Sequence, residues 1–343
     1  MIEEATESAT MAVDEPAVLA RARRLVDPAL RRAVADLPAT VRRIAEYHLG
    51  WADADGVPRP NSGGKQVRAA LAVLGAEAVG VDRHAAAAGA AAVELMHNFT
   101  LLHDDIMDGD GTRRHRPTAW REFGIGPALL AGDALLVRAV ELVQDTTAPG
   151  APDAARLLTR TAMTLVAGQS ADLDGPRDLA SYRAMAAAKT GSLLACALSI
   201  GPVLAAAPPA RAAQLSRAGT LLGQAFQAID DLLGVWGSPE HTGKPAGSDL
   251  REGKRTLPVL LALDSGTPHA VTLHKLLARP PRRTDELRAA ADLVEAAGGR
   301  DAAVVEASAL VRDARDTLSS VPMKPEVRAE LTALTDYLTR RSC

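Results

Sequence analysis

Cysteine is almost absent from this chain, since only Cys196 and Cys343 occur among its 343 residues. Two cysteines cannot build a disulfide framework or a thiolate metal site, so a reducing, cytoplasmic environment is expected. The formal net charge is only −3, which gives no support to a nucleic-acid-binding surface. The first residues, MIEEATESATMAVDEP, lack the basic start and apolar stretch of a secretion signal. These features argue against a disulfide-rich secreted protein and against a nucleic-acid-binding protein, but they do not indicate an activity.

Aromatic residues are also scarce, at 3% of the chain, and strand-like alternation is hard to find. Alanine- and leucine-rich windows with helical periodicity are common instead, and they are separated by breaks rich in glycine and proline. The sequence therefore predicts one all-α domain over residues 21–343, made of long helices. Residues 1–20 are expected to form a flexible acidic tail, and a docking role for this tail is the less favoured alternative.

Long uncharged runs are rare too, apart from the stretch between Thr190 and Ala210. This stretch is rich in alanine, glycine and proline rather than leucine and isoleucine, and Pro202 stands in its middle. A buried helix followed by a turn is therefore predicted here, rather than a transmembrane segment.

Acidic residues gather in the stretch LLHDDIMDGDGTRRHRP, which runs from Leu101 to Pro117. On a helix, Asp104 and Asp108 lie one turn apart on the same face, where their charges repel unless a cation binds between them. Carboxylates without cysteine favour hard, oxygen-binding ions such as Mg²⁺. Arg113 and Arg114 follow at once, and guanidinium groups bind phosphate in a bidentate manner. The pattern predicts a site for a metal–diphosphate complex, with a solvated charged loop as the alternative.

A second acidic segment, FQAIDDLLGVWG, spans Phe226 to Gly237. Gln227, Asp230 and Asp231 share one helical face, and Lys244 and Lys254 follow downstream. Two acidic helix ends, each followed by cations, predict two opposing walls around one metal–diphosphate cluster.

Several further motifs occur in a fixed order along the chain: GGKQVR, ELMHNFTLLHDDIMD with RRHRPTAW, GDALL, GQSADLDG, KTGSLL, FQAIDDLLG and TGKPAGSDLREGKRTLP. Together, from about residue 25 to 340, they resemble the trans-isoprenyl diphosphate synthases (polyprenyl synthetases), and in particular those of the geranylgeranyl type. This resemblance implies the isoprenoid synthase fold, in which long helices surround a central substrate cavity. It also implies a homodimer.

The resemblance further implies a Mg²⁺-dependent prenyltransferase that condenses isopentenyl diphosphate with allylic diphosphates. By analogy, three Mg²⁺ ions would be held with substrate by Asp104, Asp105, Asp108, Asp230 and Asp231. The allylic diphosphate would be neutralised by Arg113, Lys189, Lys244 and Lys254, and Thr190 and Gln227 would stabilise the allylic cation. Isopentenyl diphosphate would bind to Lys65, Arg68, His97 and Arg114. Taken alone, His97 also suits a core histidine, and Lys189 suits a helix terminus.

The chain departs from the family pattern at Gly234, where the second motif usually ends in aspartate. Asp230 is expected to remain the chief ligand there, with weaker metal binding or a slightly wider pocket. A terpene cyclase and a non-catalytic regulatory subunit are the alternatives to a synthase. The four residues expected to bind isopentenyl diphosphate favour condensation.

Product length is expected to depend on Phe99 and Thr100, which stand five and four positions before Asp104. In the family, one aromatic residue at the fifth position accompanies geranylgeranyl products, whereas aromatics at both positions accompany shorter ones. The pattern therefore resembles a geranylgeranyl diphosphate synthase, with farnesyl diphosphate as the runner-up product. An ideal helix turns Phe99 about 140° from Asp104, so ordinary packing is the alternative role for this ring.

Overall fold

The computed structural model describes residues 15–59, 64–237, 247–279 and 281–339. Within these ranges nearly all regular structure is helical, which confirms the predicted all-α class. The elements are α1 (Ala17–Ala35), α2 (Ala39–His48), α3 (Val67–Ala78), α4 (Ala87–Met107), β1 (Thr112–Arg113), β2 (Arg116–Pro117), α5 (Ala119–Phe123), α6 (Ile125–Gln144), α7 (Ala151–Asp174), α8 (Leu179–Ala186), the π-helix η1 (Ala187–Gly191), α9 (Ser192–Leu204), α10 (Pro209–Trp236), α12 (Ser248–Glu252), α13 (Leu257–Leu263), α14 (Pro268–Leu277), α15 (Thr284–Ala296), α16 (Gly299–Ser319) and α17 (Pro325–Thr339).

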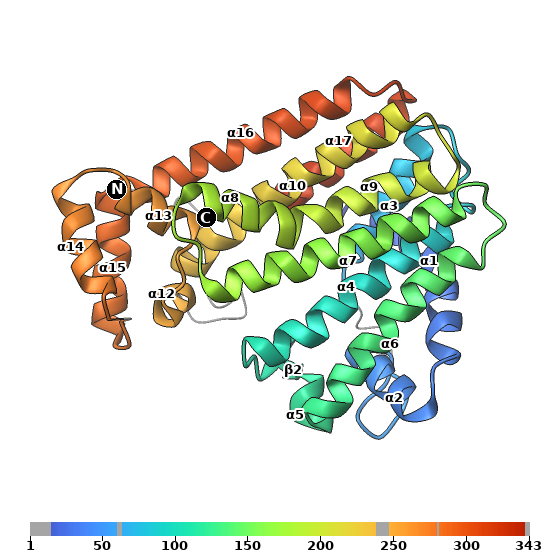
Figure 1. The fold of residues 1–343 in the computed structure, drawn as a ribbon, viewed down its shortest axis with the longest axis horizontal. Helices are drawn as coiled ribbons and strands as arrows, with labels where there is room; N and C mark the ends of the chain where they lie inside the picture. Colours follow the sequence, from blue (N-terminus) through green and yellow to red (C-terminus); the bar gives the residue numbers. More distant parts are fainter. Residues whose placement is uncertain (1–14, 60–63, 238–246, 280, 340–343) are drawn as a thin grey trace, which may run out of the picture.

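The long helices form a bundle, in which α9 packs against α3, α7 and α10, and α10 packs in turn against α16 (Figure 1). The short helices α12 to α15 gather at one end, where Leu250, Leu273 and Leu287 form a smaller apolar cluster with the last turn of α10. Helix α10 therefore links the main bundle to this end group.

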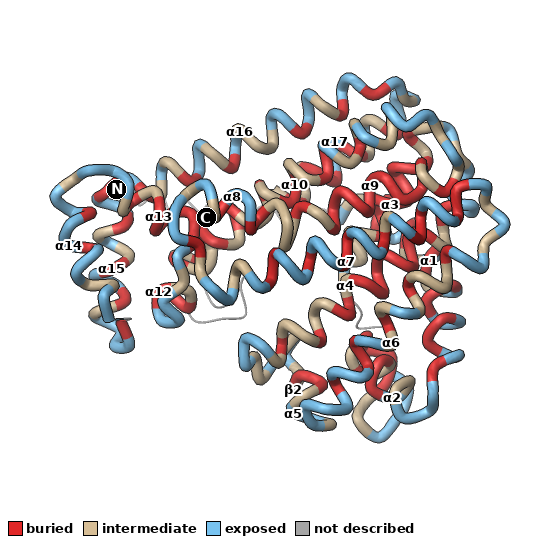
Figure 2. The backbone as a smooth tube through the Cα atoms, in the orientation of Figure 1, coloured by how far each residue is buried: buried red, intermediate tan, exposed pale blue. Residues whose placement is uncertain are grey.

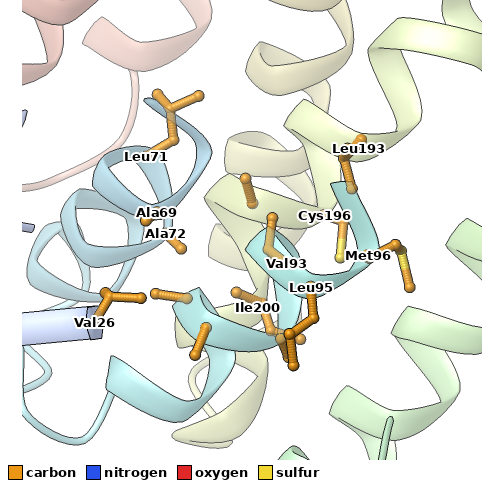
Figure 3. Close-up of a cluster of buried hydrophobic side chains, with 14 of the residues drawn as sticks. Val26, Ala69, Leu71, Ala72, Val93, Leu95, Met96, Leu193, Cys196 and Ile200 are labelled. Carbon is orange, nitrogen blue, oxygen red and sulfur yellow. The ribbon is translucent and has the colours of Figure 1, made fainter. Parts of the chain in front are cut away.

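The centre of the bundle is built from helices that are apolar on every side, as expected for helices without a solvent-facing surface. Figure 2 shows α3 and α9 buried over most of their length. Small side chains such as Ala69 and Ala72 let α3 approach its neighbours closely, while Leu95 and Ile200 fill the remaining space (Figure 3). Helices α3, α4 and α9 therefore form a closely packed core.

The uncharged stretch that the sequence singled out forms η1 and α9. Among the described residues, the continuous helical span Leu179–Leu204 is long and apolar enough to cross a membrane by length and composition. However, 67% of its most apolar window is buried inside the protein, and core helices pass the same test. Pro202 lies within α9, and the helix ends at Leu204, as the predicted buried helix and turn require.

The boundary of the acidic tail differs from the sequence prediction. Helix α1 begins at Ala17, and Val18 and Leu19 are already buried in the core. The helical domain therefore begins before residue 20, because these side chains pack against the bundle. Residues 1–14 lie outside the described part of the chain.

Candidate active site

The first acidic motif ends helix α4. Asp104 lies in its last turn, and Asp108 is the C-cap residue, which still has helical backbone angles. Burial raises the pKa of Asp104 to about 6; the nearby charge of Asp108 adds to this rise, and that of Lys189 opposes it. Asp104 and Asp108 lie one helical turn apart. A cation bound between them would relieve the repulsion between their negative charges.

Asp105 has a different environment from its neighbour. Its side chain is 1% exposed, its Oδ1 accepts a hydrogen bond of 2.8 Å from Nε of Arg113, and the same oxygen forms an ion pair with Nη2 at 2.7 Å. A 100° turn of the helix directs Asp105 to the arginine loop, and its role as a metal ligand stays a prediction. Asp105 instead anchors Arg113 beside the site.

The arginine loop is a tight hairpin, in which Arg113 pairs with Arg116 and Thr112 with Pro117. Its two central residues, Arg114 and His115, have φ angles of 51° and 60°. Positive φ at both positions is the geometry of a type I′ turn, which normally contains asparagine or glycine. The turn separates the two arginines, so that Arg113 meets Asp105 while Arg114 lines a cavity.

This cavity has a volume of about 380 Å³ and lies between α3, α4, α10 and the arginine loop. The four residues predicted to bind isopentenyl diphosphate, namely Lys65, Arg68, His97 and Arg114, all line it. Leu338 of α17 lines it as well, and Lys65 places its Nζ 4.9 Å from the ring centre of Tyr337. The structure thus brings together residues that are up to 49 positions apart, counting from Lys65 to Arg114.

Electrostatic balance in the cavity depends on a buried acid that the sequence analysis did not name. Glu94 is 4% exposed, burial raises its pKa, and its Oε1 accepts a hydrogen bond of 2.9 Å from the backbone N–H of Ala69. It thereby holds the start of α3 beside α4. Its spacing of three residues from His97 places both on one helical face, which is the signal that could have identified it.

His97 contacts Arg68 directly, with 3.0 Å between Nε2 and Nη1. Burial and then the charge of Arg68 hold the pKa of His97 well below its ordinary value. Because a guanidinium can only donate, the neutral imidazole accepts through Nε2. His97 therefore orients Arg68 and does not add another positive charge to the cavity.

Lys189 and Thr190 lie in η1, a π-helix inserted between α8 and α9. Such π-helical turns often occur at functional sites. The backbone of η1 is held between α7 and α10, and a side chain at Gly168 or Gly223 would collide with it. Two close helix approaches, both requiring glycine, thus position these two side chains.

The second acidic wall begins with a chain of hydrogen bonds. Thr190 Oγ1 donates to Gln227 Oε1 at 2.6 Å, and Gln227 Nε2 donates to Asp231 Oδ1 at 2.9 Å. Asp231 also accepts from Tyr182 Oη at 2.6 Å and from the N–H of Leu257 at 2.9 Å. The structure brings Thr190 and Gln227 together, as the sequence analysis expected.

Asp231 itself is 5% exposed, and three donors already occupy its oxygens. In this structure Asp231 therefore anchors α8, α10 and α13 to one another, and its role as a metal ligand stays a prediction. The sequence did not single out Tyr182, because its partner Asp231 is 49 positions away along the chain. Asp230, one residue earlier, is only half-buried on α10.

Three of the four cations predicted to bind the allylic diphosphate pair with a carboxylate in the described structure. Arg113 pairs with Asp105, Lys189 with Asp172, and Lys254 with Glu252 at 2.9 Å. Burial opposes the charge on Lys254, but Glu252, Asp108 and Asp249 together raise its pKa. Lys254 thus lies within electrostatic reach of Asp108 at the end of α4. Lys244 lies outside the described residues.

The donor set suits Mg²⁺, because Asp104, Asp108 and Asp230 offer only oxygen ligands. Among the described residues, no three histidine, cysteine or acidic side chains already converge into a metal cluster. Such a set would need oxygens from a ligand, as Mg²⁺ sites that bind diphosphate usually do.

Gln169, next to Gly168 on α7, is 8% exposed, and neither of its amide atoms has a hydrogen-bond partner in the described structure. An unsatisfied buried amide indicates a polar ligand or water nearby.

Phe99 and Thr100 lie outside the lining of the cavity. The Phe99 ring is 6% exposed and meets His103 edge-on, with 4.8 Å between ring centres. Thr100 is half-buried, and its hydroxyl donates to the carbonyl of His97 at 2.8 Å. Both residues therefore lie on α4 between the cavity and the acidic wall, with Phe99 packed toward the core.

Comparison with known proteins agrees with this geometry. Residues 59–294 match the family model described as polyprenyl synthetase. A (2E,6E)-farnesyl diphosphate synthase and a geranylgeranyl diphosphate synthase, both from Mycobacterium tuberculosis, are 41% and 42% identical to the chain. These alignments cover 94% of the chain and 92% of the first relative, and 95% of the chain and 94% of the second.

A crystal structure of a polyprenyl synthetase from Streptomyces coelicolor superimposes with a TM-score of 0.88 and 43% identity, covering 95% of this chain and 99% of that one. The fold, the ordered motifs and the relatives all agree. The chain belongs to the polyprenyl synthetase family and is a trans-prenyl diphosphate synthase.

Proposed function

We propose that this enzyme uses Mg²⁺ to condense isopentenyl diphosphate with allylic diphosphates and that its main product is geranylgeranyl diphosphate, made in the cytoplasm. The observation that carries the condensation is the shared cavity of Lys65, Arg68, His97 and Arg114 beside the acidic end of α4. A terpene cyclase has no need for this second diphosphate pocket. The two similar mycobacterial enzymes differ in product, so chain length rests on Phe99 and Thr100.

Isopentenyl diphosphate would bind in the 380 Å³ cavity through Arg68, Arg114 and Lys65. The two guanidinium groups suit bidentate contacts to phosphate oxygens. His97 fixes Arg68 from behind, and the hairpin turn fixes Arg114. This arrangement holds the nucleophilic double bond at a constant position relative to α4.

The allylic diphosphate would lie between α4 and α10. Bound Mg²⁺ supplies charge neutralisation that makes diphosphate a better leaving group. Lys189 and Lys254 would exchange their carboxylate partners for phosphate oxygens. As the allylic C–O bond breaks, the hydroxyl of Thr190 and the amide oxygen of Gln227 would stabilise the carbocation. The double bond of isopentenyl diphosphate then forms the new C–C bond, and a proton is lost to diphosphate, which leaves an allylic product.

Product analysis tests this proposal directly. Purified enzyme is incubated with Mg²⁺, isopentenyl diphosphate and dimethylallyl, geranyl or farnesyl diphosphate, and the dephosphorylated products are separated by chromatography. Geranylgeraniol is the expected main product. Farnesol would favour the runner-up product, and a cyclic hydrocarbon formed without isopentenyl diphosphate would indicate a cyclase. No product from the purified chain alone would indicate a regulatory subunit.

Chain-length control gives a separate prediction. Thr100 stands one turn before Asp104, so Thr100→Phe should block the growing chain and shorten the product toward farnesyl diphosphate. Phe99 stands five residues before Asp104, which is about 7.5 Å of helix and comparable to one or two isoprene units. If its ring ends the space for the growing chain, Phe99→Ala should lengthen the product. Thr272→Phe on the exposed face of α14 is the matched control and should leave product length unchanged. Unchanged length in both α4 variants would mean that other residues end elongation.

A further inference from the structure

Gly234 stands one helical turn after Asp230, where the family pattern usually has an aspartate. An atom added at its Cβ position would overlap Oδ2 of Asp249 and lie 3.0 Å from Oδ1 of the same residue. The carboxylate of Asp249 therefore occupies the space that a side chain on residue 234 would need. The absent acid on α10 is replaced in space by an acid from another segment.

The backbone around Asp249 is held in place independently of any ligand. Asp249 belongs to α12, which packs against α10, and its neighbour Leu250 is 1% exposed within the apolar cluster of the end group. The carbonyl of Asp249 accepts the backbone N–H of Lys254 at 2.9 Å. These contacts fix the position from which the carboxylate reaches α10.

Asp249 also shares a neighbouring cation with the first acidic wall. The ammonium of Lys254 feels the negative charges of both Asp108, at the end of α4, and Asp249. One lysine thus lies within electrostatic reach of the first wall and of this carboxylate. Such an arrangement is expected if both acids face the same diphosphate and metal ions.

A simpler role for Asp249 is that of an acid in the first turn of α12, where negative charge favours a helix. That role requires no glycine on a different helix, because the carboxylate could then extend into solvent. The overlap with the Cβ position of residue 234 is what distinguishes the two roles.

We propose that Asp249 supplies a carboxylate to the second metal-binding wall, in place of the aspartate that is absent at position 234, and that Gly234 provides the room for it. This inference rests on the proposed function. Asp230 and Asp249 would then hold the metal on this side, directly or through its waters, while Asp104 and Asp108 hold it on the other.

The test measures metal binding separately from turnover. Electron paramagnetic resonance of free Mn²⁺ reports its uptake by the full-length enzyme in the presence of inorganic diphosphate. Asp249→Asn should weaken Mn²⁺ binding about 10-fold or more, as loss of a supporting or ligating group usually does. Gly234→Ala should weaken it too, although no charge is removed, because the methyl group displaces Asp249.

The double variant Gly234→Asp with Asp249→Ala restores a carboxylate on α10 and removes the group with which it would collide. Its Mn²⁺ affinity should return to within about threefold of the wild-type value. Asp264→Asn, an exposed acid at the end of α13, is the control and should bind Mn²⁺ normally. Thermal unfolding of the metal-free variants verifies that each one folds.

The variant Asp108→Asn tests the metal site of the proposed function separately from the role of Asp249. If the wild-type enzyme takes up Mn²⁺ with diphosphate and Asp108→Asn does not, the metal site of the proposed function stands. Wild-type affinity in both Asp249→Asn and Gly234→Ala would then overturn only the role of Asp249. If the wild-type enzyme took up no Mn²⁺, or if Asp108→Asn took up as much as the wild type, the metal site and this inference would both be overturned.

Discussion

At the residue scale, the structure shows hydrogen bonds that anchor one aspartate of each Asp–Asp pair to other elements. Asp105 pairs with Arg113, and Asp231 accepts three hydrogen bonds, so both are structural anchors. Burial raises the pKa of all three carboxyl groups, and that of Asp104, which lies one turn before Asp108, reaches about 6. Consecutive residues on a helix point about 100° apart, which is enough to give identical side chains different roles.

The raised pKa of Asp104 predicts a conflict between stability and activity. Its pKa rises from 3.8 to about 6 on folding, so ionisation opposes folding at pH values above about 6 and not below 3.8. Asp104→Asn should therefore stabilise the metal-free protein at pH 7.5 by roughly 1–3 kcal/mol. The same change should lower turnover at least on the order of 100-fold, because it removes a proposed metal ligand.

Thermal or urea unfolding without metal, at pH 7.5 and at pH 4, measures the first effect. The gain should be present at pH 7.5 and should shrink toward zero at pH 4. Equal stability of wild type and variant at pH 7.5 would contradict the electrostatic cost, and near-normal turnover with Mg²⁺ would contradict the catalytic role.

The two diphosphate sites should be separable by single substitutions. Arg114→Ala removes a cavity cation and should raise the apparent KM for isopentenyl diphosphate by about 10- to 100-fold, as expected for a lost charge-assisted hydrogen bond. Lys254→Ala should act mainly on the allylic substrate. Steady-state kinetics with each substrate varied in turn is the measurement. Equal effects of both variants on both substrates would refute the assignment.

At the scale of elements, the arginine loop and η1 are both irregular, and both carry predicted site residues. The hairpin places the non-glycine residues Arg114 and His115 at positive φ, which costs on the order of 1 kcal/mol or more per residue. This strained conformation lets Arg114 line the cavity while Arg113 contacts Asp105. Strain in this turn therefore has a functional explanation.

Substitutions at His115 test this explanation, because its side chain is exposed. His115→Asn suits the left-handed conformation and should stabilise the protein by about 0.5–1 kcal/mol without changing kinetics. His115→Gly should relieve the same strain but loosen the turn, and so raise the KM for isopentenyl diphosphate. Urea unfolding and steady-state kinetics measure the two effects. An unchanged KM in the glycine variant would show that the turn does not preorganise Arg114.

At the scale of the whole molecule, a band of exposed apolar side chains follows α6 and α7, which pack side by side (Figure 1). The band consists of Ile125, Leu129, Leu130, Val137, Met163, Val166 and Leu173. Leu130 is 61% exposed and Met163 is 69% exposed, although both belong to long, regular helices. Apolar surface of this kind usually marks an interface.

The enzyme is therefore predicted to be a homodimer joined through α6 and α7. Light scattering at micromolar concentration should give twice the 35.8 kDa mass of the chain. Leu130→Asp places a charge in the band and should produce a monomer. Val305→Asp, at an equally exposed position on α16, is the control and should remain dimeric. A monomeric wild-type protein would exclude this interface.

Sequence alone predicts the all-α class, which the structure confirms, and it predicts one site for four residues that line one cavity in the structure. Helical periodicity and the order of the motifs are local properties, and they specify which side chains share a face. Lys65, Arg68, His97 and Arg114 could be grouped through family resemblance, although they come from three separate segments.

Only the tertiary structure decided which carboxylates have local partners, because partners such as Tyr182, Arg113 and Leu257 come from other elements. It also revealed Glu94 behind the cavity and Asp249 beside Gly234. Periodicity cannot predict such contacts, since they depend on how closely two helices approach. That approach is set by packing of the whole core, and in particular by small residues where backbones meet.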